Sequence, residues 1–149
     1  MIGMGFFRSM DISASGLTAQ RVRMDIIAQN IANAQTTRTA EGTPYRRKTV
    51  ELQAMGGGKT FADVYNDSLN ASAGAGVRAS AIRDDMSDFK LVYDPTHADA
   101  GADGYVRMPN VDLATEMIDM ITASRAYEAN VTALDAMKSM ASKALEIGK

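Results

Sequence analysis

The residues that could carry out chemistry are few, and most of them lie in one short stretch. The chain contains no cysteine and a single histidine, His97, so disulfides, zinc–thiolate sites and thiol catalysis are excluded. Asp94, Asp99 and Asp103 flank the histidine. Oxygen-rich spacing of this kind binds divalent cations weakly, but the stretch lacks the spacing and closing glutamate of a calcium loop. Aspartates beside glycine and proline more often form turns, so we predict turns and no metal site.

Enzymatic chemistry is not supported elsewhere in the chain. A Ser-His-Asp triad would have to use His97, and no pair of groups stands out as acid and base. Residues 58–60, glycine–lysine–threonine, resemble the end of a phosphate-binding loop, but Gln53 stands where that motif needs a glycine. We therefore expect no enzyme activity, no cofactor and no small-molecule substrate.

A basic triplet, Arg46, Arg47 and Lys48, follows Tyr45. On a strand these side chains would point to alternate faces, so only two of them would share a patch. The chain as a whole has 16 basic and 18 acidic residues and a formal net charge of -2, which disfavours a nucleic-acid partner. We interpret the triplet as a solvated strand face or a patch that meets an acidic subunit.

Length and composition limit the elements that could position these groups. The 149 residues, 46% hydrophobic and 23% charged, suit one ordinary domain or two very small ones. Apolar runs are only a few residues long, against roughly 20 for a membrane-spanning helix. The first residues lack the layout of a signal peptide, so we expect any export to use a route without a cleaved signal.

The first segment has helical periodicity over residues 6–33. Met10, Leu17, Met24 and Ile31 recur every seven residues, with Ile27 on a companion position. Gly16 interrupts this stripe and marks either a close helix approach or a weak spot in the helix. Asn33 and the polar residues after it indicate the end of the helix.

The middle of the chain favours strands. Residues 45–53, 77–83 and 89–93 have the alternation or the composition of strands. Glycines at both ends of the stretch 55–76 indicate a mobile loop or an extended insert. Three short strands make a thin core, so this middle region is marginal on its own.

The strongest pattern covers residues 111–146. Steps of four and three link Leu113, Met117, Met120, Ser124, Tyr127, Val131, Leu134, Lys138, Ala141 and Leu145. Pro109 and Asn110 suit a helix entry, with the asparagine able to cap, and Asp112 and Glu116 suit the positive end of the helix dipole. A periodic run beyond about 25 residues favours a coiled coil.

The apolar arc of this segment is wider than one contact would cover, because Ile118, Ile121, Met137 and Met140 lie beside the stripe. Two interpretations remain open. The terminal helices pack on each other and on other subunits, or they form an intramolecular helical hairpin on a small sheet. Arg125 is likewise either part of a surface salt bridge or, with Tyr127 and Asn130, a polar device that fixes helix register.

These patterns predict a mainly α fold with a small β-rich middle, in which short strands and loops lie between long N- and C-terminal helices. The expected division is an N-terminal axial helix over 1–36, a central β-rich and loop region over 37–110, and a C-terminal axial helix over 111–149.

Two long motifs resemble those of a known family. Residues 15–37 look like the N-terminal signature of flagellar rod and hook axial proteins, and residues 104–134 look like its C-terminal counterpart. Residues 44–48 and 93–99 are similar to the proximal rod members. The family-motif positions within these stretches are Ser15, Gly16, Leu17, Asn30, Asn33, Pro109 and Asn110.

The resemblance implies a structural subunit of the bacterial flagellar basal-body rod, which assembles helically through its terminal helices and transmits torque. The resemblance also implies that these long N- and C-terminal helices form a coiled-coil axial layer. It implies passage through the flagellar type III export apparatus and a place in the periplasm-spanning rod. The implied partners are further copies of the chain, the rod proteins FlgB, FlgF and FlgG, the junction protein FliE, and the membrane ring. A soluble coiled-coil oligomerisation or binding module is the alternative.

Assembly through terminal helices predicts an interface made of the two stripes and the polar residues on them. The expected interface residues are Met10, Leu17, Met24, Ile27, Ile31, Leu113, Met117, Met120, Ile121, Arg125, Tyr127, Asn130, Val131, Leu134 and Leu145.

Overall fold

The computed structural model describes residues 2–55 and 76–147. Its elements, in chain order, are α1 (Ile2–Ala32), β1 (Lys48–Ala54), β2 (Val77–Asp84), β3 (Lys90–Tyr93), β4 (Tyr105–Met108) and α3 (Leu113–Ile147). The expected combination of two long terminal helices with a small β-rich middle is confirmed. Most of the stretch predicted as a loop or insert, with the glycine–lysine–threonine sequence in it, lies outside the described residues.

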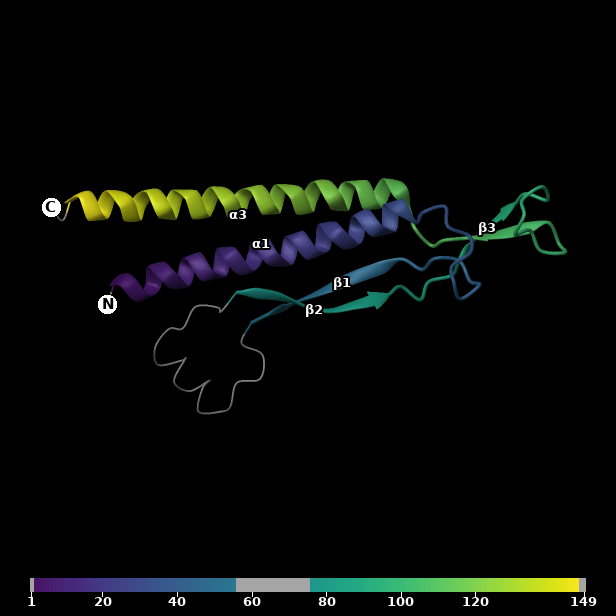
Figure 1. The fold of residues 1–149 in the computed structure, drawn as a ribbon, viewed down its shortest axis with the longest axis horizontal. Helices are drawn as coiled ribbons and strands as arrows, with labels where there is room; N and C mark the ends of the chain where they lie inside the picture. Colours follow the sequence, from purple (N-terminus) through teal and green to yellow (C-terminus); the bar gives the residue numbers. More distant parts are fainter. Residues whose placement is uncertain (1, 56–75, 148–149) are drawn as a thin grey trace, which may run out of the picture.

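The two helices lie side by side and run antiparallel along the long axis of the molecule (Figure 1). Both chain ends are therefore at one end of the molecule. The β1–β2 hairpin lies along α1, while β3 and β4 project beyond the other end of the helix pair. The intramolecular helical hairpin on a small sheet therefore exists. The terminal helices also pack on each other, as the other interpretation required of them, and a single chain does not test their packing on other subunits.

The helices approach closely where their side chains are small. Ala19 and Ala123 are almost fully buried at 1% exposure each. A Cβ atom placed on Gly16 would lie 3.1 Å from Oδ1 of Asn130 on the other helix. Gly16 therefore marks a close helix approach, which was one of its two sequence-based interpretations. Coiled-coil packing of the pair is not established by these contacts.

Both helix ends that face the β-rich middle are capped by side chains. Asn33 donates from Nδ2 to the Gln29 carbonyl (2.9 Å) and accepts from Thr36 Oγ1 (3.2 Å), as expected for the end of α1. At the start of α3, Thr115 Oγ1 donates to Asp112 Oδ2 (2.7 Å), and this bond lowers the pKa of the Asp112 carboxyl. Asp112 is therefore the residue at the helix entry, and the expected cap by Asn110 is wrong.

The middle region forms two separate two-stranded antiparallel sheets, β1–β2 and β3–β4. All three predicted strands exist, and the β1–β2 register shifts opposite Glu51 and Leu52, where Ser80 is the extra residue of β2. β4 was not predicted. It pairs with β3 from Lys90 opposite Met108 to Tyr93 opposite Tyr105, and Gly104, at φ +72°, closes the turn against the Tyr93 ring.

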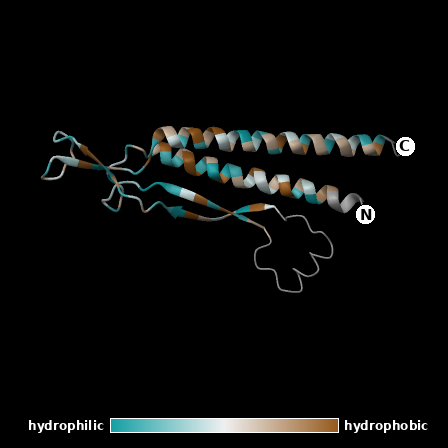
Figure 2. Cartoon of the chain, turned by 180° about the vertical axis from the view of Figure 1, so that it is seen from behind, coloured by the Kyte–Doolittle hydropathy of each residue, from teal (hydrophilic) through white to brown (hydrophobic). Residues whose placement is uncertain are grey.

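The hydrophobic core is small for a chain of this length. The buried apolar side chains among the described residues are Ala19, Ile27, Tyr45, Val106, Pro109, Val111 and Ala123. Hydrophobic residues recur along both helices, most densely near the start of α3 (Figure 2). No helix in the described ranges is long and apolar enough to cross a lipid bilayer.

Candidate functional site

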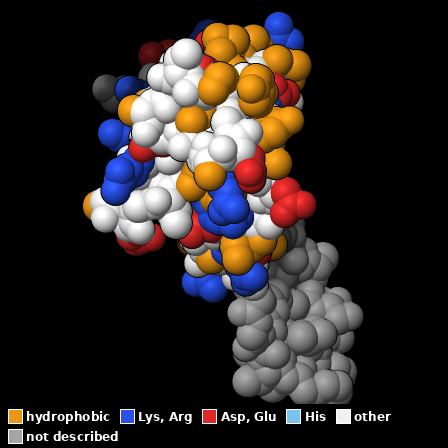
Figure 3. Space-filling view, turned by 90° about the vertical axis from the view of Figure 1, so that its right-hand side faces the viewer, with side chains coloured by type: hydrophobic (Ala, Val, Ile, Leu, Met, Phe, Trp, Pro, Cys, Tyr) orange, Lys and Arg blue, Asp and Glu red, His pale blue; other side chains and the backbone are white. Residues whose placement is uncertain are grey.

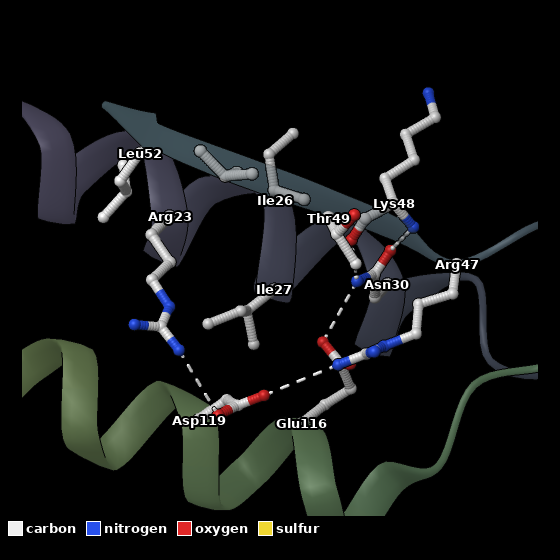
Figure 4. Close-up of a pocket in the computed structure, with 11 residues that line it drawn as sticks. Arg23, Ile26, Ile27, Asn30, Arg47, Lys48, Thr49, Leu52, Glu116 and Asp119 are labelled. Carbon is white, nitrogen blue, oxygen red and sulfur yellow. Dashed lines mark hydrogen bonds and ion pairs between the residues drawn. The ribbon is translucent and has the colours of Figure 1, made fainter. Parts of the chain in front are cut away.

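A cluster of connected polar side chains lies where the end of α1, the segment before β1 and the start of α3 converge (Figure 4). We call Asn30, Tyr45, Arg47, Asn110 and Glu116 the polar junction. It borders an open groove of about 340 Å³ with α1 as its floor and β1 and α3 as its walls. Asn30 and Glu116 are each only 1% exposed, so their polar atoms must find partners inside the protein.

Asn30 is the centre of the polar junction, because it links three segments through one amide. Its Nδ2 donates to Glu116 Oε2 (3.0 Å) and to the Lys48 carbonyl (2.8 Å). Its Oδ1 accepts from the Tyr45 hydroxyl (2.9 Å) and from the Lys48 backbone N–H (2.9 Å). Two donors and two acceptor positions are the whole capacity of an asparagine side chain, so Asn30 is fully satisfied.

Arg47 and Glu116 form the ion pair of the polar junction. Arg47 Nε donates to Glu116 Oε1 at 2.6 Å, and Asp85 and Asp119 lie 3.7 and 3.5 Å from its other nitrogens. Burial acts to lower the pKa of Arg47, but the hydrogen bond and charge of Glu116 outweigh it, so the pKa is raised overall. Arg23, on α1, adds a weaker pair with Asp119 at 3.5 Å.

Asn110 ties the β-rich middle to the start of α3. Its Oδ1 accepts from the Arg47 backbone N–H (2.8 Å), and its Nδ2 donates to the Asp85 carbonyl (3.0 Å) and to Ser87 Oγ (2.8 Å). Hydrogen bonds from Ser87, with the nearby charge of Arg47, lower the pKa of Asp85. Asn110 therefore holds the β1 and β2 ends in place of capping a helix.

The basic triplet does not form the solvated strand face that was one of its two interpretations, because Arg46, Arg47 and Lys48 are all half-buried. The other interpretation, a patch that meets an acidic subunit, is not tested by a single chain. Arg47 forms the ion pair of the polar junction, and the Arg46 guanidinium lies 4.3 Å from the centre of the Phe89 ring. Tyr45, beside the triplet, is buried, and this burial raises its pKa, assisted by the negative charges of Asp84 and Glu116. The hydroxyl stays protonated and can keep donating to Asn30.

The chemistry available at the polar junction is structural. Every charged group in it faces an opposite charge or a hydrogen-bond partner, and the side chain of Asn30 has no hydrogen-bonding capacity left for a ligand. A catalytic base or nucleophile needs a lone pair directed at a substrate. The polar junction instead connects the end of α1, the segment before β1 and the start of α3 through hydrogen bonds and an ion pair.

The residues around His97 form turns, as predicted. Asp94 accepts from the backbone N–H and the hydroxyl of Thr96 (3.0 and 2.6 Å), and these bonds lower its pKa. Asp99 accepts from Thr37 (2.8 Å), and its N–H donates to His97 Nδ1 (3.1 Å). In the described ranges no three acidic or histidine side chains gather at a distance suited to a metal ion.

The family-motif residues near the start of the chain serve as a second attachment point. Ser15 Oγ donates to the Ile12 carbonyl (2.6 Å) and accepts from the backbone N–H of Val77 at the start of β2 (3.0 Å). Gly76, at φ +99°, passes so close that a Cβ there would overlap the Ser15 hydroxyl. Ser15 and Gly16 thus hold β2 and α3 on two sides of α1.

The predicted interface residues fall into two groups. Ile27 is buried and most of the others are half-buried, namely Met10, Leu17, Met24, Ile31, Met120, Tyr127, Asn130, Val131 and Leu134. Leu113, Met117, Ile121, Arg125 and Leu145 are exposed. The α3 face turned to α1 contains Glu116, Ala123 and Asn130 in place of Leu113, Met117 and Leu145. The structure of one chain does not test whether the exposed group contacts neighbours.

Exposed hydrophobic side chains also gather at the end that carries β3 and β4 (Figure 3). Met86 is 78% exposed, Leu91 and Tyr93 are 65% exposed, and Tyr105 is 50% exposed. The Tyr93 and Tyr105 rings contact each other edge to face, with their centres 5.2 Å apart. This surface was not predicted from the sequence.

Glu116, Arg47, Tyr45 and Asp85 were not predicted as a connected site. Glu116 follows the spacing of the inward face of α3, four residues before Met120. A glutamate on the buried side of a helix is a signal for a paired charge. From the sequence alone, Glu116 was attributed to the helix dipole. The wide apolar arc of this helix did not show which of its sides would face α1.

Comparisons with known proteins agree with this arrangement. Residues 10–38 match the family described as "Flagella basal body rod protein", and residues 102–147 match "Flagellar basal body rod FlgEFG protein C-terminal". The flagellar basal-body rod protein FlgC of Bacillus subtilis is 54% identical over 149 residues, covering 96% of this chain and 98% of the relative. The FlgC proteins of Borreliella burgdorferi and Salmonella typhimurium are 46% and 37% identical, over 97% and 98% of this chain and 98% and 100% of their own lengths.

The chain belongs to the FlgC family of flagellar basal-body rod proteins. The family is structural, so the chain is a rod subunit and not an enzyme. Its matched segments are the two helices that the structure places side by side, together with their connections to the β-rich middle. Nothing in the fold or the comparisons favours a soluble coiled-coil binding module.

Proposed function

We propose that this rod subunit assembles through the outward faces of its two terminal helices, which then form a coiled-coil axial layer. The observation that carries the proposal is the first half of α3. Its inner face packs on α1, yet Leu113, Met117, Ile118 and Ile121 on the other side are between 45% and 62% exposed. A contiguous apolar face of this kind on a structural subunit is typical of an interaction surface.

The proposed neighbours are further copies of the chain, the rod proteins FlgB, FlgF and FlgG, and the junction protein FliE. Growth of an open helical assembly requires heterologous contacts, in which one surface meets a different surface on the next subunit. The apolar end formed by β3 and β4 offers a second surface for unlike neighbours. The small core supports delivery through the flagellar export apparatus, because a marginal monomer unfolds readily.

The connection made by the polar junction supports torque transmission. A subunit that transmits twist must keep its outer region rigidly attached to its axial helices. Asn30 and Glu116 provide that attachment through buried, saturated hydrogen bonds, and buried polar networks of this kind favour one arrangement over others.

Ile121→Asp tests the assembly surface. Ile121 is 53% exposed in the single chain, so the variant should fold with nearly unchanged stability. A charge buried without a partner at each repeated contact costs several kcal/mol, which should prevent rod assembly. The measurement is motility, together with counts of isolated basal bodies, in a strain that carries the variant as its only copy.

Ala133→Asp is the matched control, because Ala133 is exposed on a different side of α3. It should assemble far better than Ile121→Asp. Normal rods and motility in the Ile121→Asp strain would contradict the proposed surface.

A further inference from the structure

The outward side of α3 combines apolar side chains with an uncommitted charge. We call Met117, Ile118, Ile121 and Arg125 the outer ridge. Met117, Ile118 and Ile121 are 52%, 62% and 53% exposed. Arg125 is exposed, and within the described residues it has no hydrogen-bond or ion-pair partner. An arginine beside an apolar ridge is a frequent anchor at protein interfaces, where it meets a carboxylate.

The outward side of α1 has the opposite character. Thr18, Arg21, Asp25, Ala28 and Ala32 are all exposed, and steps of three and four residues place them on one stripe. We call them the outer stripe. The buried positions of α1, Ala19 and Ile27 among them, lie on the opposite side of the helix, so the outer stripe faces away from α3. Apart from Arg21, its side chains are short and leave room for bulky ones from a partner.

The two surfaces are on different helices and both face away from the α1–α3 contact, so that each can meet the other on a neighbouring copy, as heterologous stacking requires. Copies that point the same way along a common axis would place α3 of one copy beside α1 of the next. Because α1 and α3 run antiparallel within a chain (Figure 1), these two helices would also run antiparallel between copies.

The charges of the two surfaces match in that orientation. Along α3 the order is Arg125 and then Glu128, about 4.5 Å further on. Along α1, in reverse, the order is Asp25 and then Arg21, about 6 Å further on. Each cation therefore has an anion of the other helix within reach of its side chain. In the described residues, neither Asp25 nor Arg21 is used in another ion pair.

We propose that the outer ridge of one copy packs on the outer stripe of the next copy, with Arg125 paired to Asp25 and Glu128 paired to Arg21. This inference rests on the proposed function and names the partner of that surface: a second copy of this chain in the same orientation. Opposite charges across such a contact fix the register, and like charges exclude wrong alignments.

Charge reversal tests the pairing. Arg125→Glu and Asp25→Arg should each fold as the natural chain does, because both residues are exposed. Each should lower the number of complete rods at least about tenfold, since like charges at an interface cost more than a factor of ten in association. The variant with both changes restores opposite charges and should recover most of the rods. Arg78→Glu, at an exposed position of β2, is the matched control for a single reversal.

Cysteine pairing tests the geometry without relying on charge. The natural chain has no cysteine, so Asp25→Cys combined with Arg125→Cys gives one defined pair. Oxidation of rods isolated from such a strain should produce a ladder of linked copies, since both positions face away from the α1–α3 contact within one chain. Either single variant should produce no ladder.

The outcomes separate this inference from the function it rests on. Rods that form normally with either single reversal, or that give no ladder with the cysteine pair, would overturn the pairing while leaving the rod function intact. A natural chain that fails to restore rods in the deletion strain would overturn both. Rescue by the double reversal together with the ladder would establish the contact.

Discussion

The polar junction and the outer ridge meet on α3 at consecutive residues, yet they differ in exposure and in the partners of their side chains. Glu116 is 1% exposed and paired with Arg47 and Asn30, whereas Met117, the next residue, is 52% exposed and turned outward. The junction is polar and completed within the chain. The outer ridge is apolar apart from Arg125, and its side chains are exposed in the described part of the chain. The difference teaches that polar groups are satisfied within the chain, whereas burial of the apolar side chains is what the proposed assembly would add.

The comparison makes an energetic prediction. Variants of the polar junction should change the stability of the single chain, because its partners are all intramolecular. Variants of the outer ridge should leave that stability almost unchanged and act on assembly alone. The predictions below are ordered by their expected effect on the free energy of unfolding.

Glu116→Ala should have the largest effect. Removing the carboxylate leaves Arg47 without its shortest ion pair and Asn30 without one acceptor, and breaking a buried pair from one side costs about 3 kcal/mol. Urea unfolding of the purified chain measures this loss. Glu128→Ala, an exposed change on the same helix, should stay within about 0.5 kcal/mol of the natural chain. Equal stability of the two variants would show that the junction does not hold the subunit together.

Tyr45→Phe should have a smaller effect with a characteristic pH dependence. It removes one hydrogen bond to Asn30, for a loss of about 1 kcal/mol at neutral pH. Burial and the charges of Asp84 and Glu116 raise the pKa of Tyr45 in the folded chain. The stabilising contribution is therefore fully present below the unfolded pKa of about 10 and is lost as the pH rises through the higher folded pKa.

Urea titrations between neutral pH and strongly alkaline pH test the tyrosine prediction. The natural chain should lose more stability above pH 10 than Tyr45→Phe does, so the difference between the two should shrink. A difference that grows with pH would mean that Tyr45 ionises more easily in the folded chain, against the burial observed here.

Sequence reasoning predicted the elements with local periodicity and missed features that depend on contacts between distant segments. The long helices, three of the four strands and the close approach at Gly16 follow from local periodicity and from the position of glycine, so they were predictable. Asn110 was predicted as a cap and instead holds Arg47 and Asp85, because its role depends on segments distant in sequence. β4 is four residues long, too short to show a periodic pattern.

The stripe over Leu113, Met117 and Leu145 illustrates why the site itself was harder to predict. Periodicity reports which residues share a helix face, but a helix with two apolar sides gives no indication of which side meets the partner within the chain. The structure assigns the inward side to Glu116, Ala123 and Asn130. These three residues are too weakly hydrophobic for a periodicity analysis to identify that side. Only packing against α1, which is distant in sequence, distinguishes the inward side of α3 from the outward side.

Thiol labelling of Ile118→Cys, in the isolated chain and in purified rods, tests the central claim most directly. Ile118 is 62% exposed in the single chain, and Glu41, in an exposed loop, provides the control position as Glu41→Cys. The account predicts rapid labelling of position 118 in the isolated chain and strong protection in rods, with position 41 accessible in the isolated chain. Equal labelling of position 118 in the chain and in rods would contradict the claim that neighbouring subunits complete this face.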